Sequence, residues 1–339
     1  MSNNFSDLLT KTVFHESLVL RIVEVSIIVI LIVLCVVGNC LLFYIIVTTS
    51  PRWWTTPANF FNVNLAFTDL MVGIVVLPFM AMSISWQSWL LSDILCQSTA
   101  FATILLMASS TLTLSVISLD RYFCICLPLR YQSVVTTERV ASVVAVLWLT
   151  SFLLASIPLF GWGRYTFRPQ SIPICSVLLE GQQRHVILLW SFMIILPVTV
   201  MIYSYMQILK VARKQANQIG CVENHFNSRM MTGTNETIGT SQNGTVSFGN
   251  NDSKHFVSRS LKSLKIVSII IGTFFLCWGP YIGFNFWCLD NAKPIPYLGD
   301  LLTTFLAFTN SSVNPYLIIM FNRDFKIAFR NIFKSRQQE

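Results

Sequence analysis

Residues 27–47 read IIVILIVLCVVGNCLLFYIIV, an apolar stretch without a charged side chain. About 20 such residues in a helix are enough to cross the ~30 Å hydrocarbon core of a bilayer. Comparable stretches follow near residues 57–85, 94–126, 137–160, 185–212, 262–288 and 297–321. In lipid each backbone polar group must be satisfied within its own segment, so we expect helices at all these positions. The predicted fold class is an all-α membrane protein with a seven-transmembrane helix bundle.

The composition agrees with this interpretation. Hydrophobic residues make up 54% of the 339 residues and charged residues only 11%, whereas a soluble domain has roughly 25% charged residues. Most of the 23 Lys and Arg residues fall on the cytoplasmic side if the N-terminus is outside, which is the asymmetry expected of membrane proteins. The net charge of +8 therefore reflects topology and attraction to membrane lipid, and it does not indicate nucleic-acid binding.

The segments outside the spans are expected to lack folded domains. Residues 1–23 form an extracellular N-terminus without the apolar core of a cleavable signal peptide, and Asn4 begins a glycosylation sequon there. Residues 215–257 are rich in Asn, Thr, Gly and Ser, which predicts a flexible third intracellular loop. Cys96, Cys175 and Cys288 fall on the outer side, where disulfides can form.

Polar residues inside the spans are candidates for function, because ionisable groups are costly at membrane depth. Asp69 lies in mid-span, and Ser110, Asn310, Ser311 and Asn314 lie at similar depth. Carboxylate, hydroxyl and amide oxygens together suit a small cation such as Na⁺. The alternative is that these groups only form hydrogen bonds between helices.

The third span ends in Asp120-Arg121-Tyr122, where an adjacent carboxylate lowers the cost of a charge near the membrane interface. Several spans contain proline, which removes a helical hydrogen bond and bends the helix. Such bends provide hinges for a bundle that changes shape, although proline is also common in membrane helices. The prolines in question are Pro78, Pro158, Pro197, Pro280 and Pro315.

With these motifs in order along the chain, the sequence resembles the class A (rhodopsin-like) G-protein-coupled receptors from about residue 24 to residue 334. Each span contains a residue or motif typical of that family. They are Asn39, Leu65-Ala66-Phe-Thr-Asp69, Asp120-Arg121-Tyr122, Trp148, Pro197 with Tyr205, Cys277-Trp278-Gly-Pro280 and Asn314-Pro315. The resemblance also implies a short amphipathic helix over residues 322–334, after a bundle that covers residues 24–321, and a short cytoplasmic tail over 335–339.

The resemblance implies roles for several groups of residues. A disulfide joins Cys96 to Cys175, and an allosteric Na⁺ site that favours the inactive state is lined by Asp69, Ser110, Asn310, Ser311 and Asn314. No covalent cofactor is expected. Coupling to a heterotrimeric G protein, with Gs favoured among the subtypes, involves Asp120, Arg121, Tyr122, Pro128, Leu129, Tyr205, Lys210, Arg213, Lys262 and Lys265. The switch between states involves Thr111, Pro197, Phe274, Trp278, Asn314, Pro315 and Ile318.

The sequence also departs from the family pattern. Ile318 replaces the tyrosine that ends the Asn-Pro-x-x-Tyr motif, and Ser260 replaces the acidic residue that can restrain Arg121. Thr111 stands where a branched aliphatic residue is usual. The loss of the acid weakens the inactive state and the loss of the tyrosine weakens the active state. We favour ligand-independent basal activity, because Ser260 removes a direct restraint between helices.

The outer halves of the spans determine the ligand class. Thr103 occupies the position of the aspartate that binds the ammonium group in amine receptors, and Phe308 occupies the position of the retinal-binding lysine in opsins. The predicted pocket is aromatic, rich in sulfur and poor in charges, which suits a neutral or lipidic small molecule or the chain's own second extracellular loop. It consists of Thr99, Thr103, Met107, Val177, Leu189, Trp190, Met193, Trp278, Tyr281, Ile282, Asn285, Thr304 and Phe308.

The predicted function is therefore that of an orphan-type plasma-membrane receptor, near the amine and opsin groups, that activates G proteins. A lysine-less opsin-like protein and a non-signalling receptor scaffold are the alternatives. A transporter or channel is disfavoured, because no internal repeat is visible and Asp69 is the one deep ionisable residue. An enzyme is disfavoured as well, because no nucleophile–base set or metal-ligand spacing is present.

Overall fold

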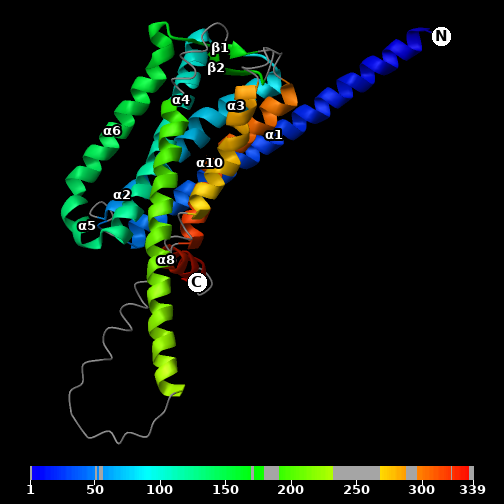
Figure 1. Ribbon diagram of the computed structural model, residues 1–339. Helices are drawn as coiled ribbons and strands as arrows, with labels where there is room; N and C mark the ends of the chain where they lie inside the picture. The colour runs from blue at the N-terminus through cyan, green and yellow to red at the C-terminus, as the bar shows by residue number, and fades with distance from the viewer. Residues whose placement is uncertain are drawn as a thin grey trace, which may run out of the picture.

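The computed structural model describes residues 2–49, 52, 56–168, 172–178, 191–231, 268–287, 296–321 and 323–335. In this part of the chain, long helices form a bundle with a small sheet at one end (Figure 1). The elements are α1 (Ser2–Thr49), α2 (Pro57–Met71), η2 (Val72–Val76), α3 (Leu77–Trp86), α4 (Asp93–Cys126), α5 (Pro128–Val134), α6 (Thr137–Ser156), η3 (Ile157–Phe160), β1 (Arg164–Arg168), β2 (Ile174–Leu178), η4 (Ser191–Ile195), α8 (Leu196–Met231), a helix over Ser268–Trp287, α10 (Tyr297–Phe321) and α11 (Arg323–Ser335).

Six of the described helices are long and apolar enough to cross a membrane. They cover Leu18–Thr49, Pro57–Trp86, Asp93–Cys126, Thr137–Phe160, Met193–Lys214 and Ser268–Trp287. The 25-residue helix α10 is about 37 Å long at 1.5 Å per residue, which also suffices to cross the hydrocarbon core. Helix α10 is less apolar than the other six because it contains a polar run, Thr309 to Ser312 followed by Asn314. This run is mostly buried inside the bundle.

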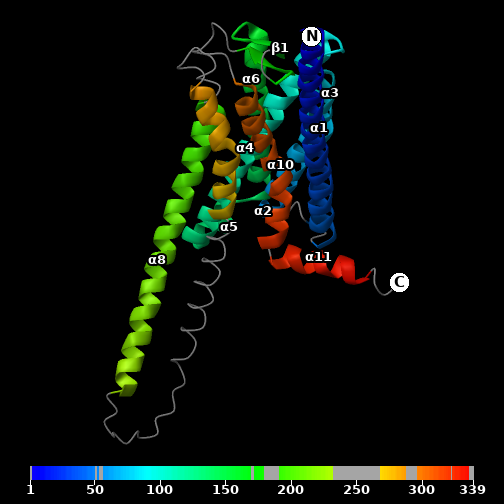
Figure 2. The same ribbon diagram turned by 90° about the vertical axis from the view of Figure 1, so that its right-hand side faces the viewer.

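Helix α4 is central to the bundle and packs against α2, α6 and α8, while α10 packs against α1. The sheet lies at one end of the bundle and α11 lies at the other, where it turns away from the bundle axis (Figure 2). We refer to these as the sheet end and the α11 end. Phe325 of α11 is buried against the core, as expected of an amphipathic helix with one apolar face.

Local sequence explains where the central helices begin. The Ser92 hydroxyl accepts a hydrogen bond from the Leu95 amide and caps α4, and Asp93 places a negative charge in its first turn. The Thr136 hydroxyl caps α6 by accepting from the Arg139 amide. These side chains satisfy amides that have no partner within the helix.

Gly38 allows α1 to approach α10 closely. A Cβ at this position would lie 2.8 Å from the Cγ of Pro315 and 2.9 Å from the ring of Tyr316. Small residues commonly permit such contacts between membrane helices. The contact brings α1 close to the Asn314-Pro315 motif.

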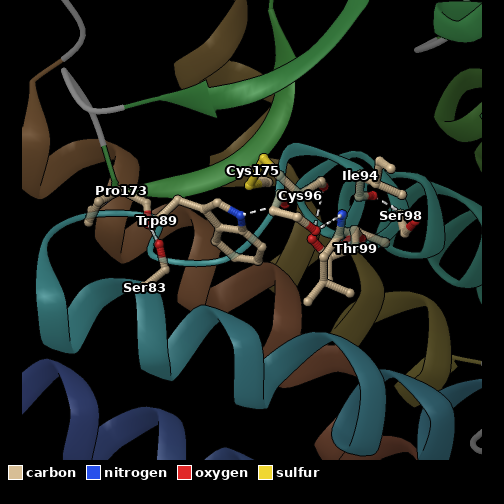
Figure 3. Close-up of a disulfide and its surroundings, with 11 residues drawn as sticks. Ser83, Trp89, Ile94, Cys96, Ser98, Thr99, Pro173 and Cys175 are labelled. Atoms are coloured by element: carbon tan, nitrogen blue, oxygen red, sulfur yellow. Dashed lines mark hydrogen bonds between the residues drawn. A yellow bond between two sulfur atoms is a disulfide. The ribbon is translucent and has the colours of Figure 1, made fainter.

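A disulfide fastens the sheet to the top of α4. Strands β1 and β2 are antiparallel, with Phe167 opposite Cys175, and Cys175 is bonded to Cys96 near the start of α4 (Figure 3). The hydroxyl of Ser83 donates to the carbonyl of Pro173, which adds a second attachment, to α3. The predicted pairing of Cys96 with Cys175 is confirmed.

Two helices extend further than the sequence analysis expected. Helix α8 continues to Met231, so residues 215–231 are helical although they were predicted to belong to a flexible loop. The sequence Lys-Val-Ala-Arg-Lys-Gln-Ala from Lys210 consists mainly of strong helix formers, which allows the helix to continue beyond the span. Helix α1 begins at Ser2, within the expected N-terminal segment. The remaining loop residues, 232–257, lie outside the described residues.

Candidate functional site

The sheet end contains a cavity of about 160 Å³ between α3, α4, the sheet, the Ser268–Trp287 helix and α10. We refer to it as the outer cavity. Its lining is mostly apolar and aromatic, and Met107, Trp278 and Phe308 are almost completely buried. A concave, largely apolar space with a few polar groups is typical of small-molecule sites.

Ten of the thirteen predicted pocket residues line the outer cavity. They are Thr99, Thr103, Met107, Val177, Met193, Trp278, Tyr281, Asn285, Thr304 and Phe308. Ile282 does not line it and packs instead against the apolar core. Leu189 and Trp190 lie outside the described residues. Most of the positions that the resemblance implies therefore lie around one cavity.

The sequence predicts a pocket with few charges, but two residues of opposite charge line the outer cavity. Asp300 and Arg168 both line the outer cavity. Asp300 lies in the first turn of α10, one turn before Thr304 and two before Phe308, so its helical spacing could have placed it in the pocket. The position of Arg168 depends on the pairing of β1 with β2, where it lies opposite Ile174. The sequence alone does not fix that register.

A second group of polar side chains lies inside the bundle around Asp69, which is fully buried. The Ser110 hydroxyl donates to Oδ1 of Asp69, and the Asn314 amide donates to Oδ2, each over 2.8 Å. The Asn39 amide donates to the backbone carbonyls of Cys35 and Ser311. Helices α1, α2, α4 and α10 are thereby joined by one polar cluster, as the sequence predicted for residues at this depth.

The cluster also retains oxygens without a partner. Within the described residues, Oδ1 of Asn39 and Oγ of Ser311 are buried and accept no hydrogen bond. The Cys35 thiol contacts both the Asp69 carbonyl and the Ser311 carbonyl, so α1, α2 and α10 meet at this point. Buried polar atoms are rarely left unpaired. Carboxylate, hydroxyl and carbonyl oxygens together form a donor set that suits a small hard cation.

The residues of the predicted switch lie between the outer cavity and the α11 end. Phe274 is 1% exposed and stacks on Trp278 with ring centroids 6.1 Å apart. Thr111 of α4 is buried too, and Pro197 lies in the first turn of α8, directly after the π-helical turn η4. Ile318 is buried in the apolar core, where it supplies no hydroxyl group.

At the α11 end, Asp120 is hydrogen-bonded on both of its carboxylate oxygens. Oδ2 accepts from the guanidinium of Arg121, and Oδ1 accepts from the Tyr131 hydroxyl over 2.7 Å. Burial raises the pKa of Tyr131, and the negative charge of Asp120 raises that pKa further. Tyr131 was not singled out by the sequence analysis, because its contact with Asp120 depends on the turn at Leu127 and Pro128 that starts α5.

The surface around this ion pair is partly exposed. The Arg121 side chain is 27% exposed and Leu129 is 96% exposed. Lys210 and Arg213 are exposed on α8, and Tyr122 packs edge-on against Tyr203. Lys262 and Lys265 lie outside the described residues. The predicted coupling residues that are described thus gather at one end of the bundle.

Comparisons with known proteins identify the family. The profile of the family described as "7 transmembrane receptor (rhodopsin family)" matches residues 38–317. The chain belongs to this family. It is 30% identical over 283 residues to the histamine H2 receptor of Cavia porcellus, covering 82% of this chain and 70% of that receptor. It is 28% identical over 290 residues to the alpha-1A adrenergic receptor of Oryzias latipes, covering 82% of this chain and 60% of that receptor.

The fold is also found among solved structures. Squid rhodopsin has a TM-score of 0.75 and 21% sequence identity, with 94% of this chain and 86% of that chain covered. Membership of the rhodopsin family confirms the predicted seven-helix fold and the prediction of a membrane receptor that is not an enzyme. In this receptor Thr103 and Phe308 both line the outer cavity.

Proposed function

We propose that this receptor transmits occupancy of the outer cavity to a heterotrimeric G protein at the α11 end. It lies in the plasma membrane with the sheet end outside and the α11 end in the cytoplasm. The observation that supports this function most directly concerns α4. This continuous helix contributes Thr103 to the cavity and Arg121 to the opposite surface, about 27 Å apart along its axis.

The signal is a shift between two populated states of the bundle. A ligand shifts this equilibrium only by the difference between its affinities for the two states. Pro280 lies in the Ser268–Trp287 helix, close to Trp278 in the cavity wall, and removes one backbone hydrogen bond. That helix moves outward about Pro280 and exposes the surface around Arg121 to the Gα subunit.

The receptor has basal activity, and Gs is the favoured partner. Ser260 cannot form the ionic restraint on Arg121 that an acidic residue would form. The ligand is a small molecule with an apolar body, because apolar and aromatic side chains dominate the cavity wall. Ile174 and Val177 of the sheet also face the cavity, so the alternative is that the chain's own loop occupies the site. Na⁺ held by the Asp69 cluster stabilises the inactive state.

Nucleotide exchange tests this function. Purified receptor in lipid nanodiscs is mixed with each Gα subtype and Gβγ, and wild type is compared with Arg121→Ala. Arg330→Ala is the control, because Arg330 is an exposed arginine on α11 at the same end of the molecule. We expect exchange above the receptor-free rate with wild type and with the control, and no acceleration with Arg121→Ala. No acceleration with any subtype would favour a non-signalling scaffold.

A further inference from the structure

Asp300 is a buried carboxylate that faces the outer cavity without a cationic partner. It is 5% exposed, and its one hydrogen bond within the described residues comes from the Ile172 amide, over 3.4 Å to Oδ2. No Lys, Arg or His nitrogen of the described residues lies within 4.0 Å of it. A carboxylate accepts about four hydrogen bonds, and a buried one is costly unless it is paired. Asp300 is therefore under-satisfied on its cavity side.

Arg168 is the complementary case, and it lies on the sheet. It ends β1, is partly buried and lines the same cavity. Its guanidinium group has five N–H donors, yet it makes no hydrogen bond or ion pair with another residue in the described ranges. The sheet that holds it is fixed to α4 by the disulfide between Cys96 and Cys175, close to Ile174, the partner of Arg168 in the sheet.

The two charges are thus held on separate elements and are not paired with each other. An uncharged ligand would leave both charges unpaired. A simple cation would be attracted by Asp300 and repelled by Arg168, and a simple anion would meet the reverse arrangement. A ligand that contains both an ammonium group and a carboxylate satisfies both residues.

We infer that the outer cavity binds a zwitterionic amino acid with an aromatic side chain. Its ammonium group binds Asp300, its carboxylate binds Arg168, and its ring lies among Met107, Trp278 and Phe308. This inference rests on the proposed function only in taking the outer cavity as the ligand site. It places the acidic anchor on α10, whereas Thr103 of α4 supplies no charge.

Matched ligands test the inference on the full-length receptor. For phenyl, phenol and indole rings, the amine, the carboxylic acid and the amino acid are compared by their shift of the receptor's melting temperature and by Gα nucleotide exchange. We expect at least one amino acid to bind about tenfold or more tightly than both its matched amine and its matched acid. Loss of a hydrogen bond to a charged group reduces affinity by about 10-fold to 100-fold. Asp300→Asn and Arg168→Gln should each weaken binding of that amino acid by such a factor.

Two exposed residues provide controls with the same chemistry. Asp93→Asn changes an acid in the first turn of α4, and Arg164→Gln changes the arginine at the other end of β1. Neither residue lines the outer cavity, and we expect both variants to bind like wild type. Loss of binding in these variants equal to that in Asp300→Asn and Arg168→Gln would overturn the specific roles of Asp300 and Arg168.

Stability measured without ligand shows whether Asp300 and Arg168 bind each other. In the absence of ligand, the effects of Asp300→Asn and Arg168→Gln on melting temperature should add in the double variant, because the two side chains are not paired. Strong coupling between them would show that they bind each other, and would overturn the ligand role. The inference also fails if no member of the panel binds, or if amine and amino acid bind equally. If exchange stays dependent on Arg121 in those cases, the proposed receptor function stands.

Discussion

At the scale of single residues, the proposed sodium site depends on Asp69. Its carboxylate is fully buried and accepts hydrogen bonds from the Ser110 hydroxyl and the Asn314 amide. We predict a higher melting temperature in NaCl than in choline chloride at equal ionic strength, and no such difference for Asp69→Asn. Asp93→Asn, an exposed acid on α4, should keep the wild-type difference. Equal melting temperatures of wild type in the two salts would show that the Asp69 cluster does not bind Na⁺.

Tyr131 gives a prediction with a defined dependence on pH. Tyr131→Phe leaves Oδ1 of Asp120 without its hydrogen bond, which should reduce stability by about 1–2 kcal/mol. The folded-state pKa of Tyr131 is raised by burial and by Asp120. The contribution of the hydroxyl is therefore complete below the ordinary tyrosine pKa of about 10 and decreases as the pH rises above it.

The measurement is the unfolding of wild type and Tyr131→Phe between pH 6 and pH 11. The difference in stability should be constant up to about pH 9 and become smaller above pH 10. Tyr44→Phe serves as the control, since Tyr44 is half exposed on α1 and its hydroxyl forms no hydrogen bond within the described residues. A difference that grows at high pH would show that the Tyr131 hydroxyl does not stabilise the folded state by donating to Asp120.

At the scale of elements, the contact between α1 and α10 makes Gly38 sensitive to substitution. Gly38→Ala would place a methyl group 2.8 Å from the Pro315 ring, and overpacking of this kind costs about 1–3 kcal/mol. Gly272→Ala is the matched control, because a Cβ there meets no atom of the described residues outside its own helix within 4 Å. We expect a lower melting temperature for Gly38→Ala alone. Equal melting temperatures would show that α10 can move away from α1 without cost.

The helices themselves were largely predictable, because hydropathy and length decide which segments cross a membrane. The resemblance to the rhodopsin-like receptors also implied a pocket with Thr99, Thr103 and Met107, and their spacing of four residues puts them on one face of α4. Contacts that depend on loops could not be derived. The hydrogen bond from Tyr131 to Asp120 follows from the turn at Leu127, and the cavity position of Arg168 follows from the register of the two strands.

Asp300 and the extension of α8 show a different limit. The spacing of Asp300 relative to Thr304 and Phe308 was visible in the sequence, but a pocket defined by resemblance to amine receptors and opsins did not include it. Residues 215–231 are polar, which predicts a loop, whereas the helix formers that begin at Lys210 favour continuation of the helix. Hydropathy does not reveal the extension of α8, because a helix that continues outside the membrane does not need apolar residues.

At the scale of the whole molecule, the proposed function requires that the two ends of the bundle influence each other. The outer cavity and the Arg121 surface share α4, and the Ser268–Trp287 helix places Trp278 and Phe274 between them. A change in the cavity wall should therefore alter activity at the far end through the equilibrium between states. Without such coupling the two sites would be independent surfaces of one scaffold.

Gα nucleotide exchange with wild type, Trp278→Ala, Arg121→Ala and the double variant in nanodiscs tests this coupling most directly. Trp278→Ala should change the ligand-free exchange rate severalfold, since Trp278 touches the cavity and stacks on Phe274. Both variants with Arg121→Ala should show only the receptor-free rate. An exchange rate that Trp278→Ala leaves unchanged, or one that persists in the double variant, would contradict the claim that the cavity controls G-protein activation through Arg121.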